Sequence, residues 1–165
     1  MLKSIRFIII GLVLASIIGT CIYFVAGVSS TFPPIKEYEF SGSVDQLLAG
    51  IREYTILNPN AKLTITDTTG GKENGYGIYM DVELKKDTSL LLYNLECEKI
   101  DQNNNPPKTL IKLIGAFNKH NYKVGGYGIK GIGVKGMIDD FEIEFLMRLK
   151  RQKHMTINAL AVRNL

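Results

Sequence analysis

The sequence predicts an α+β fold in which one N-terminal transmembrane helix precedes a small domain, with a mostly antiparallel sheet and two helices packed on one face. Three observations predict it. Residues 7–28 form an almost uninterrupted apolar run. Several later segments alternate polar and apolar residues at the period of a strand, and two others repeat apolar residues at helical spacing. We therefore expect a membrane anchor at residues 1–28, a spacer at 29–35 and an exported domain at 36–165.

The apolar run contains 22 residues. As a helix it would be about 33 Å long, enough to cross a hydrocarbon core of about 30 Å. Lys3 and Arg6 precede the run, and this bias of cations predicts a cytoplasmic N-terminus with the C-terminal domain outside. No asparagine lies in a glycosylation sequon, which agrees with a bacterial source. We therefore expect a single-pass protein of the bacterial inner (cytoplasmic) membrane.

Two alternatives to a retained anchor remain open. Cleavable signal peptides have apolar cores of roughly 7–15 residues, shorter than this run, although Val25-Ala26-Gly27 offers small residues for cleavage. A lipoprotein signal would end at Cys21, where the preceding Thr20 is a poor fit and the apolar run continues past the cysteine. These features favour the retained anchor.

Small residues within the run share one helix face. Gly11, Ala15 and Gly19 are spaced by four residues, and small residues at this spacing let two membrane helices approach closely. The face predicts a homodimer formed through the membrane helix. Glycine and alanine are also common in membrane helices that do not pair, and this simpler explanation stays open.

The first part of the domain reads as a strand and then a helix. Lys36–Phe40 alternates polar and apolar residues. Ser43 and Gln46 form a capping box, in which each side chain satisfies a free backbone N–H of the other residue. The helix that follows ends at Asn58-Pro59, because proline cannot continue the hydrogen-bond ladder. Its apolar face consists of Val44, Leu47, Leu48, Ile51 and Tyr54.

A strand meander should follow this helix. Three segments alternate polar and apolar residues and are expected to pair antiparallel: Lys62–Asp67, Tyr76–Lys85 and Thr88–Glu98. Lys86-Asp87 is the expected turn between the last two. Thr109–Phe117 fits either a strand or a helix, and Gly115, which would weaken a short helix, favours the strand.

The second helix is predicted over Val134–Lys153. Acidic residues occupy its first half and basic residues its second half, an order that complements the helix dipole. The last twelve residues are interpreted as a tail or a short edge element. The buried face of the helix is expected to consist of Val134, Ile138, Phe141, Phe145 and Leu149.

A glycine-rich segment before this helix contains a literal GxGxxG at residues 126–131. A dinucleotide site needs that motif inside a βαβ unit, whereas the sheet expected here is antiparallel. We therefore interpret the segment as a loop that contacts a partner. The expected contact residues are Tyr122, Gly125, Gly126, Tyr127 and Gly128.

Charge is distributed unevenly along the domain. Residues 36–107 carry 7 basic and 12 acidic residues, a balance of −5, whereas residues 108–165 carry 11 and 4, a balance of +7. A basic half of this kind can contact anionic headgroups or an acidic protein partner. No nucleic-acid-binding motif accompanies the cations, so we expect no nucleic acid partner.

Residue types that support catalysis are sparse. His120 and His154 are the only histidines, and neither lies in a metalloprotease or hydrolase motif. Cys97 lies in an apolar alternation and is expected to be a buried hydrophobe. Asp81 and Glu83 fall on the solvated face of a strand, where carboxyl groups stay ordinary acids. The sequence therefore predicts no catalytic residue, cofactor or metal site.

These observations favour a membrane-anchored extracytoplasmic binding protein that recognises another protein. An immunity protein that neutralises a toxin, or an accessory subunit of an envelope complex, would fit this description. The alternative is a small envelope enzyme or ligand sensor that uses the loops Gly70–Gly75 and Gly125–Gly133.

Overall fold

The computed structural model describes residues 33–67, 77–100 and 106–161. Within them, no helix is both long enough and apolar enough to span a bilayer. Residues Pro33–Leu165 form one compact unit. Several predictions fall outside the described residues: the membrane helix at 7–28 with its face of Gly11, Ala15 and Gly19, the lipidation site at Cys21, and the loop Gly70–Gly75.

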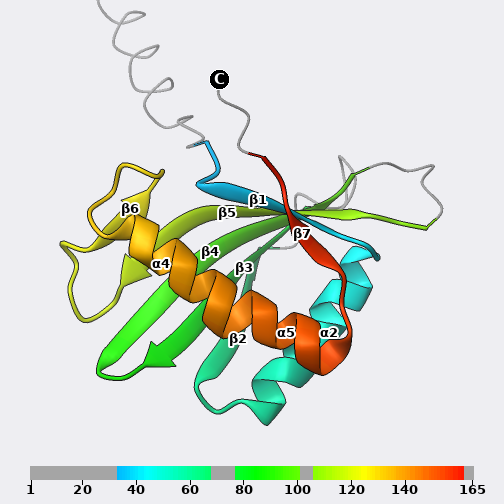
Figure 1. The fold of residues 1–165 in the computed structure, drawn as a ribbon, viewed down its shortest axis with the longest axis horizontal. Coiled ribbons are helices and arrows are strands. Elements are labelled where there is room, and N and C mark those ends of the chain that lie inside the picture. Colours follow the sequence, from blue (N-terminus) through cyan, green and yellow to red (C-terminus); the bar gives the residue numbers. More distant parts are fainter. Residues whose placement is uncertain (1–32, 68–76, 101–105, 162–165) are drawn as a thin grey trace, which may run out of the picture. The chain divides into compact units, whose positions relative to one another are not determined.

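The domain is built on one antiparallel sheet of seven strands, which run in the order β2-β3-β4-β5-β1-β7, with β6 paired to β5 (Figure 1). The predicted antiparallel sheet is confirmed. The strands are β1 (Lys36–Phe40), β2 (Ala61–Asp67), β3 (Gly77–Lys86), β4 (Ser89–Lys99), β5 (Thr109–Asn118), β6 (Gly125–Tyr127) and β7 (Ile157–Ala159).

The first strand lies between β5 and β7 instead of beside β2. It pairs with β5 from Lys36 opposite Leu113 to Phe40 opposite Thr109. The preceding residue, Ile35, donates its backbone N–H to the Leu113 carbonyl at 2.7 Å and is buried. The folded domain therefore includes Ile35, which the sequence placed at the end of the spacer.

Two helical segments cover one face of the sheet, as predicted (Figure 1). The first is α2 (Val44–Leu57), which begins with the expected capping box: Gln46 N–H donates to Ser43 Oγ at 3.2 Å, and Ser43 N–H donates to Gln46 Oε1 at 2.8 Å. All five residues of its predicted apolar face are buried.

The second helical segment runs without a break through α4 (Val134–Asp140), the π-helical η1 (Phe141–Leu146) and α5 (Met147–Lys153). Its predicted buried face is confirmed. The π-helical turn was not predicted. It is marked by Met147 N–H, which donates to the carbonyl of Glu142, five residues back. In the π-helical segment Phe145 and Leu146 both face the core, as the adjacent pair Met137 and Ile138 does in α4.

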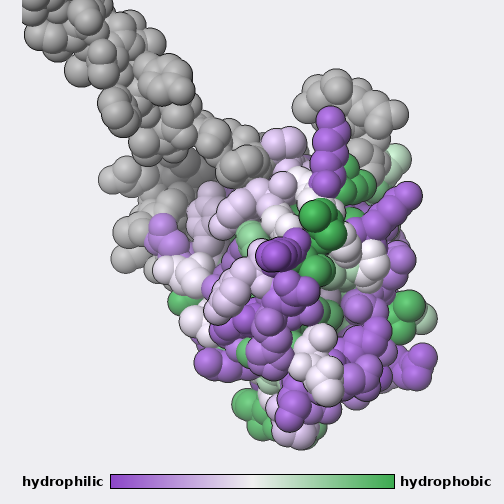
Figure 2. All heavy atoms as spheres, turned by 90° about the vertical axis from the view of Figure 1, so that its left-hand side faces the viewer, coloured by the Kyte–Doolittle hydropathy of each residue, from purple (hydrophilic) through white to green (hydrophobic). Residues whose placement is uncertain are grey.

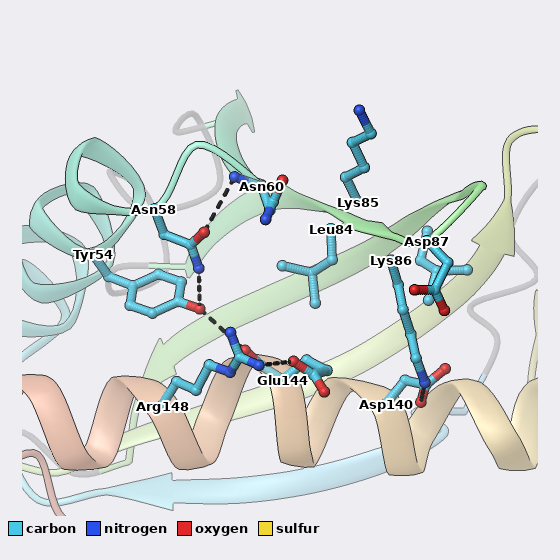
Figure 3. Close-up of a pocket in the computed structure, with 11 residues that line it drawn as sticks. Tyr54, Asn58, Asn60, Leu84, Lys85, Lys86, Asp87, Asp140, Glu144 and Arg148 are labelled. Atoms are coloured by element: carbon cyan, nitrogen blue, oxygen red, sulfur yellow. Dashed lines mark hydrogen bonds and ion pairs between the residues drawn. The ribbon is translucent and has the colours of Figure 1, made fainter.

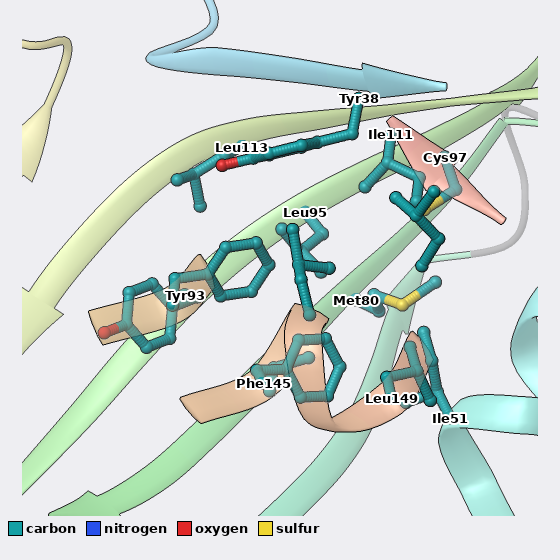
Figure 4. Close-up of a cluster of buried hydrophobic side chains, with 14 of the residues drawn as sticks. Tyr38, Ile51, Met80, Tyr93, Leu95, Cys97, Ile111, Leu113, Phe145 and Leu149 are labelled. Atoms are coloured by element: carbon teal, nitrogen blue, oxygen red, sulfur yellow. The ribbon is translucent and has the colours of Figure 1, made fainter. Parts of the chain in front are cut away.

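Aromatic rings join the second helical segment to the sheet and to α2. Phe141 lies between Tyr93 and Tyr38, with ring centroids 4.9 and 6.0 Å away. Phe145 stacks 5.3 Å from Phe141 and meets Tyr54 edge-to-face at 5.5 Å. Figure 4 shows Tyr38, Tyr93 and Phe145 around this part of the core.

The three buried tyrosines also keep their hydroxyl groups hydrogen-bonded. Tyr93 donates to the Met137 carbonyl at 3.0 Å, Tyr54 to the Glu144 carbonyl at 3.0 Å, and Tyr38 to the Glu142 carboxylate at 3.1 Å. Each bond ends on the second helical segment. Because a buried hydroxyl needs a partner, these bonds fix the position of that segment along the sheet.

Three local features refine the sequence interpretation. The turn between β3 and β4 consists of Asp87-Thr88, one residue later than predicted, and Asp87 takes the left-handed conformation at φ 51°. Thr109–Asn118 is a strand, as favoured. The segment Ile157–Ala159 pairs with β1 and forms the edge of the sheet.

Candidate functional site

The glycine-rich segment forms a structured projection between β5 and α4. Its β6 strand pairs with β5, so that Gly125, Gly126 and Tyr127 lie opposite Phe117, Ala116 and Gly115. Gly125 N–H also donates to the Ile132 carbonyl at 2.8 Å, which closes the segment on itself. The sequence predicted a loop here and missed β6, since the three residues of this strand include two glycines.

Gly125 is required by its surroundings. Its φ is 115°, a conformation that side chains rarely adopt, and an added Cβ atom would lie 2.3 Å from the Ala116 carbonyl oxygen. Gly128 also has a positive φ, at 82°. These conformations explain the glycines through local geometry, without a bound phosphate.

Large apolar side chains project from this segment into solvent. Tyr122 is 93% exposed and Ile132 is 72% exposed. Tyr127 is half-exposed and packs edge-to-face on Phe117, with ring centroids 5.0 Å apart. Figure 2, which views the molecule from the side that carries β6, shows hydrophobic side chains among hydrophilic ones. We call Tyr122, Tyr127, Ile129 and Ile132, together with Lys123, Lys130 and Lys135, the loop patch.

A second surface feature is a cleft of about 300 Å³ between the C-terminal end of α2, the β3–β4 turn and the second helical segment. Figure 3 shows side chains from all three elements converging on it. Its polar and charged lining consists of Tyr54, Asn58, Asn60, Lys85, Lys86, Asp87, Asp140, Glu144 and Arg148.

Two ion pairs cross or border the cleft. Lys86 Nζ lies 2.5 Å from Asp140 Oδ1 and joins the sheet to the helix. This hydrogen bond from the ammonium to Asp140 raises the pKa of Lys86. Arg148 pairs with Glu144 one helical turn away. Lys86 and Arg148 thus each have a carboxylate partner, and the whole lining carries three cations and three carboxylates, so the cleft presents balanced charge.

A tyrosine forms the inner wall of the cleft. Tyr54 Oη accepts a hydrogen bond from Asn58 Nδ2 at 2.7 Å and donates to the Glu144 carbonyl. Burial raises the pKa of Tyr54, so this phenol stays neutral at physiological pH. In this form it is a fixed hydrogen-bonding group.

Exposed apolar side chains occur next to the cleft in the chain. Ile56 and Leu57 immediately precede Asn58, and both are largely exposed. Ile143 and Met147 precede Glu144 and Arg148, and each is about half exposed. We call these four residues and the cleft residues the helix-side surface. The sequence missed it, because the ion pair between Lys86 and Asp140 joins residues 54 positions apart.

The other residues considered for chemistry are dispersed. His120 Nδ1 lies 2.8 Å from the Thr88 carbonyl oxygen, so this exposed ring bridges to the β3–β4 turn. His154 caps the C-terminal end of α5 in a left-handed conformation at φ 52°. The Glu83 carboxylate pairs with Lys119 at 3.0 Å, and Asp81 accepts a hydrogen bond from Asn94 at 2.6 Å.

Cys97 is fully buried, as expected, and burial raises the pKa of its thiol to about 12. Among the described residues, no group of three or more histidine, cysteine, aspartate or glutamate side chains has an arrangement suited to a metal ion. No protein-family model, curated protein or solved structure matches this chain.

Proposed function

We propose that this chain is a membrane-anchored extracytoplasmic protein of the bacterial inner membrane whose domain binds another protein. The apolar run at residues 7–28 supports the anchor, and Lys3 and Arg6 before it support an external domain. An immunity protein or an accessory subunit of an envelope complex would have this arrangement. The small-residue face of Gly11, Ala15 and Gly19 supports a dimer through the anchor.

The observation that carries the protein-binding proposal is the helix-side surface. Its cleft is small, and four of the charged side chains that line it are already paired, Lys86 with Asp140 and Arg148 with Glu144. Four exposed apolar residues accompany it, and methionine and arginine are both enriched in protein interfaces. A partner that covers Leu57 and Met147 would remove apolar surface from water. It would also desolvate the two ion pairs, which favours a partner with complementary polar groups.

A site-specific crosslinking experiment tests this surface. The full chain would carry a photo-reactive amino acid in place of Met147, with a matched variant in place of Lys62, which is exposed on β2. In native membranes we expect one discrete crosslinked product from position 147 and none from position 62. The Arg148→Ala substitution should reduce the yield at position 147. Equal products at both positions, or none at position 147, would contradict the proposal.

A ligand sensor or small envelope enzyme is the second candidate. It is favoured by the convergence of Lys86, Asp140, Glu144 and Arg148 beside the neutral hydroxyl of Tyr54. A small zwitterionic molecule could exchange with these ion pairs. Native mass spectrometry of the full chain purified in mild detergent distinguishes the two functions. A bound small molecule that is lost in Arg148→Gln would favour the sensor over the protein-binding proposal.

A further inference from the structure

We propose that the loop patch is a second membrane contact, which docks on anionic phospholipid headgroups beside the anchor. This inference rests on the membrane anchor of the proposed function, but not on the helix-side surface. The inference identifies anionic phospholipid as the partner of the loop for which the sequence predicted a partner contact. Three independent observations lead to it: the charge of the segment, its exposed apolar side chains and its position in the fold.

The charge of the segment has one sign. No acidic residue occurs between Asp101 and Asp139, while this stretch contains six lysines. Lys123, Lys130 and Lys135 are exposed, and none of them pairs with a carboxylate among the described residues. Lys119 differs, because it pairs with Glu83. The three unpaired ammonium groups are therefore available to an anionic surface.

The apolar side chains match the chemistry of a bilayer interface. Tyrosine is enriched at the level of the headgroups, where its ring is apolar and its hydroxyl remains hydrated. Tyr122 and Ile132 are the most exposed apolar side chains of the patch. They are interspersed with the lysines, as in peripheral segments that bury an apolar face at the headgroup boundary and place cations beside it.

The position of the patch follows from the sheet register. Tyr127 pairs with Gly115 and Lys36 pairs with Leu113, and both partners lie on β5. The two contacts share the side of β5 that faces away from β4 (Figure 1). The two β5 residues, Gly115 and Leu113, are two positions apart in the strand, or about 7 Å at the rise of a strand. The loop patch thus begins beside the point where the chain enters the domain.

If residues 7–28 span the membrane, the point where the chain enters the domain is held close to the bilayer. Only four residues separate Val28 from Pro33, and five extended residue steps reach at most about 17 Å. The headgroup layer occupies roughly 5–7 Å of this distance. The spacer therefore keeps Pro33 within reach of the headgroups, and the loop patch begins on the strand next to this entry point. The short spacer and the positive charge favour lipid over an acidic protein as the occupant.

The absence of tryptophan from the chain allows a direct test. Tyr122→Trp places a single indole in the loop patch, and Ile56→Trp places one on α2, where the side chain is 81% exposed. Each full-length variant would be reconstituted into vesicles of phosphatidylcholine alone or mixed with phosphatidylglycerol. In the mixed vesicles we expect the emission of Tyr122→Trp to move to shorter wavelength and to be quenched by brominated lipid. Ile56→Trp should show neither change.

Charge removal tests the electrostatic part of the contact. Replacing Lys123, Lys130 and Lys135 with glutamine in the Tyr122→Trp background should weaken docking about fivefold per lysine. Lys62→Gln, on β2, should leave the quenching unchanged. Because all four lysines are exposed, these substitutions are not expected to prevent folding.

The outcomes separate the two proposals. If the full chain fails to float with vesicles, the anchor itself is wrong. If the chain floats but Tyr122→Trp stays unquenched in both kinds of vesicle, the loop contact is wrong while the anchor stands. A third outcome would point to a protein partner. In it, brominated lipid does not quench this tryptophan in vesicles, yet water-soluble quenchers do not reach it in native membranes. The occupant would then be a protein, and the lipid proposal would be overturned.

Discussion

The buried tyrosines differ from the exposed ones in what their hydroxyl groups do. Tyr93 is fully buried and donates to the carbonyl of Met137 at 3.0 Å. Tyr79 has an exposed ring, and its hydroxyl contacts the Glu96 carboxylate at the surface at 3.2 Å. Removing a buried partner leaves a polar group without water, whereas solvent replaces a partner lost at the surface. Tyr93 and Tyr79 therefore form a matched pair for measuring the effect of burial on a tyrosine hydrogen bond.

We expect Tyr93→Phe to lower the free energy of unfolding by about 1 kcal/mol, because it removes one buried hydrogen bond while the Met137 carbonyl keeps the bond from the Phe141 N–H. Tyr79→Phe should change it by less than about 0.5 kcal/mol. Urea denaturation of both variants, followed by circular dichroism, measures the difference. Equal losses in the two variants would show that the buried hydrogen bond contributes no more to stability than the exposed one.

Buried acids make the domain sensitive to alkaline pH. Burial raises the pKa of the Cys97 thiol from 9.0 to about 12, and it also raises the pKa of Tyr93 and Tyr38 above the ordinary 10.0. The Glu142 carboxylate beside Tyr38 adds to the effect there. The folded state keeps these groups protonated at pH values where the unfolded chain releases their protons. Stability is therefore complete below about pH 9 and falls above it.

We expect the urea midpoint to be flat from pH 7 to 9 and then to decrease. Each buried group contributes a loss of about 1.4 kcal/mol per pH unit once its pKa in the unfolded chain has been passed. Cys97→Ala should remove the part of the decrease that begins near pH 9 and leave the tyrosine part that begins near pH 10. A midpoint that stays constant up to pH 11 would contradict this account.

At the scale of single elements, two glycines of the same region have opposite roles. Gly125 has a positive φ, and its backbone packs against Ala116. Gly136 lies in α4, where an added Cβ atom would meet nothing within 4 Å. Glycine is needed in the first position, whereas in the second it only lowers helix propensity.

Gly125→Ala should therefore destabilise the domain by about 1–3 kcal/mol and unpair β6. Gly136→Ala should stabilise it by about 0.5–1 kcal/mol. Thermal unfolding gives both values, and amide hydrogen exchange at Gly126, which lies opposite Ala116, reports whether β6 still pairs with β5. Protection at Gly126 that is unchanged in Gly125→Ala would show that the strand tolerates the substitution.

Elements with a strong local pattern were predictable. The capping box at Ser43 and the alternation through β3 and β4 act within a few residues, so the sequence carries the whole signal. The π turn had no such signal, because Phe141, Phe145 and Leu149 also suit an ordinary helix.

At the scale of the whole molecule, the order of the strands was the main unpredicted feature. Pairing of β1 with β5 joins residues far apart in the chain, and local periodicity has no information about such a pairing. The cleft was missed for the same reason, since Lys86 meets Asp140 only in the folded domain. Tyr122 and Tyr127 of the loop patch were singled out from the sequence, because tyrosines among glycines are a local signal, whereas the exposure of Ile129 and Ile132 was not predicted.

The proposed topology requires the whole domain to lie outside the cytoplasm, and the cysteines make this measurable. The chain has two cysteines. Cys97 is buried, with a pKa of about 12, so it should not react with a maleimide near pH 7. In a Cys21→Ser background, Ile56→Cys therefore adds one reactive thiol on the exposed side of α2.

We expect a membrane-impermeant maleimide to label this Ile56→Cys variant fully in intact spheroplasts, with no further gain after lysis, because the domain faces the outside. The Cys21→Ser parent should stay unlabelled until denaturant exposes Cys97, which confirms that its thiol is intact. Labelling of Ile56→Cys only after lysis would place the domain in the cytoplasm. The cation bias of Lys3 and Arg6 would then be the wrong guide to orientation. The loop patch would face the inner leaflet, where anionic lipids could still bind its lysines.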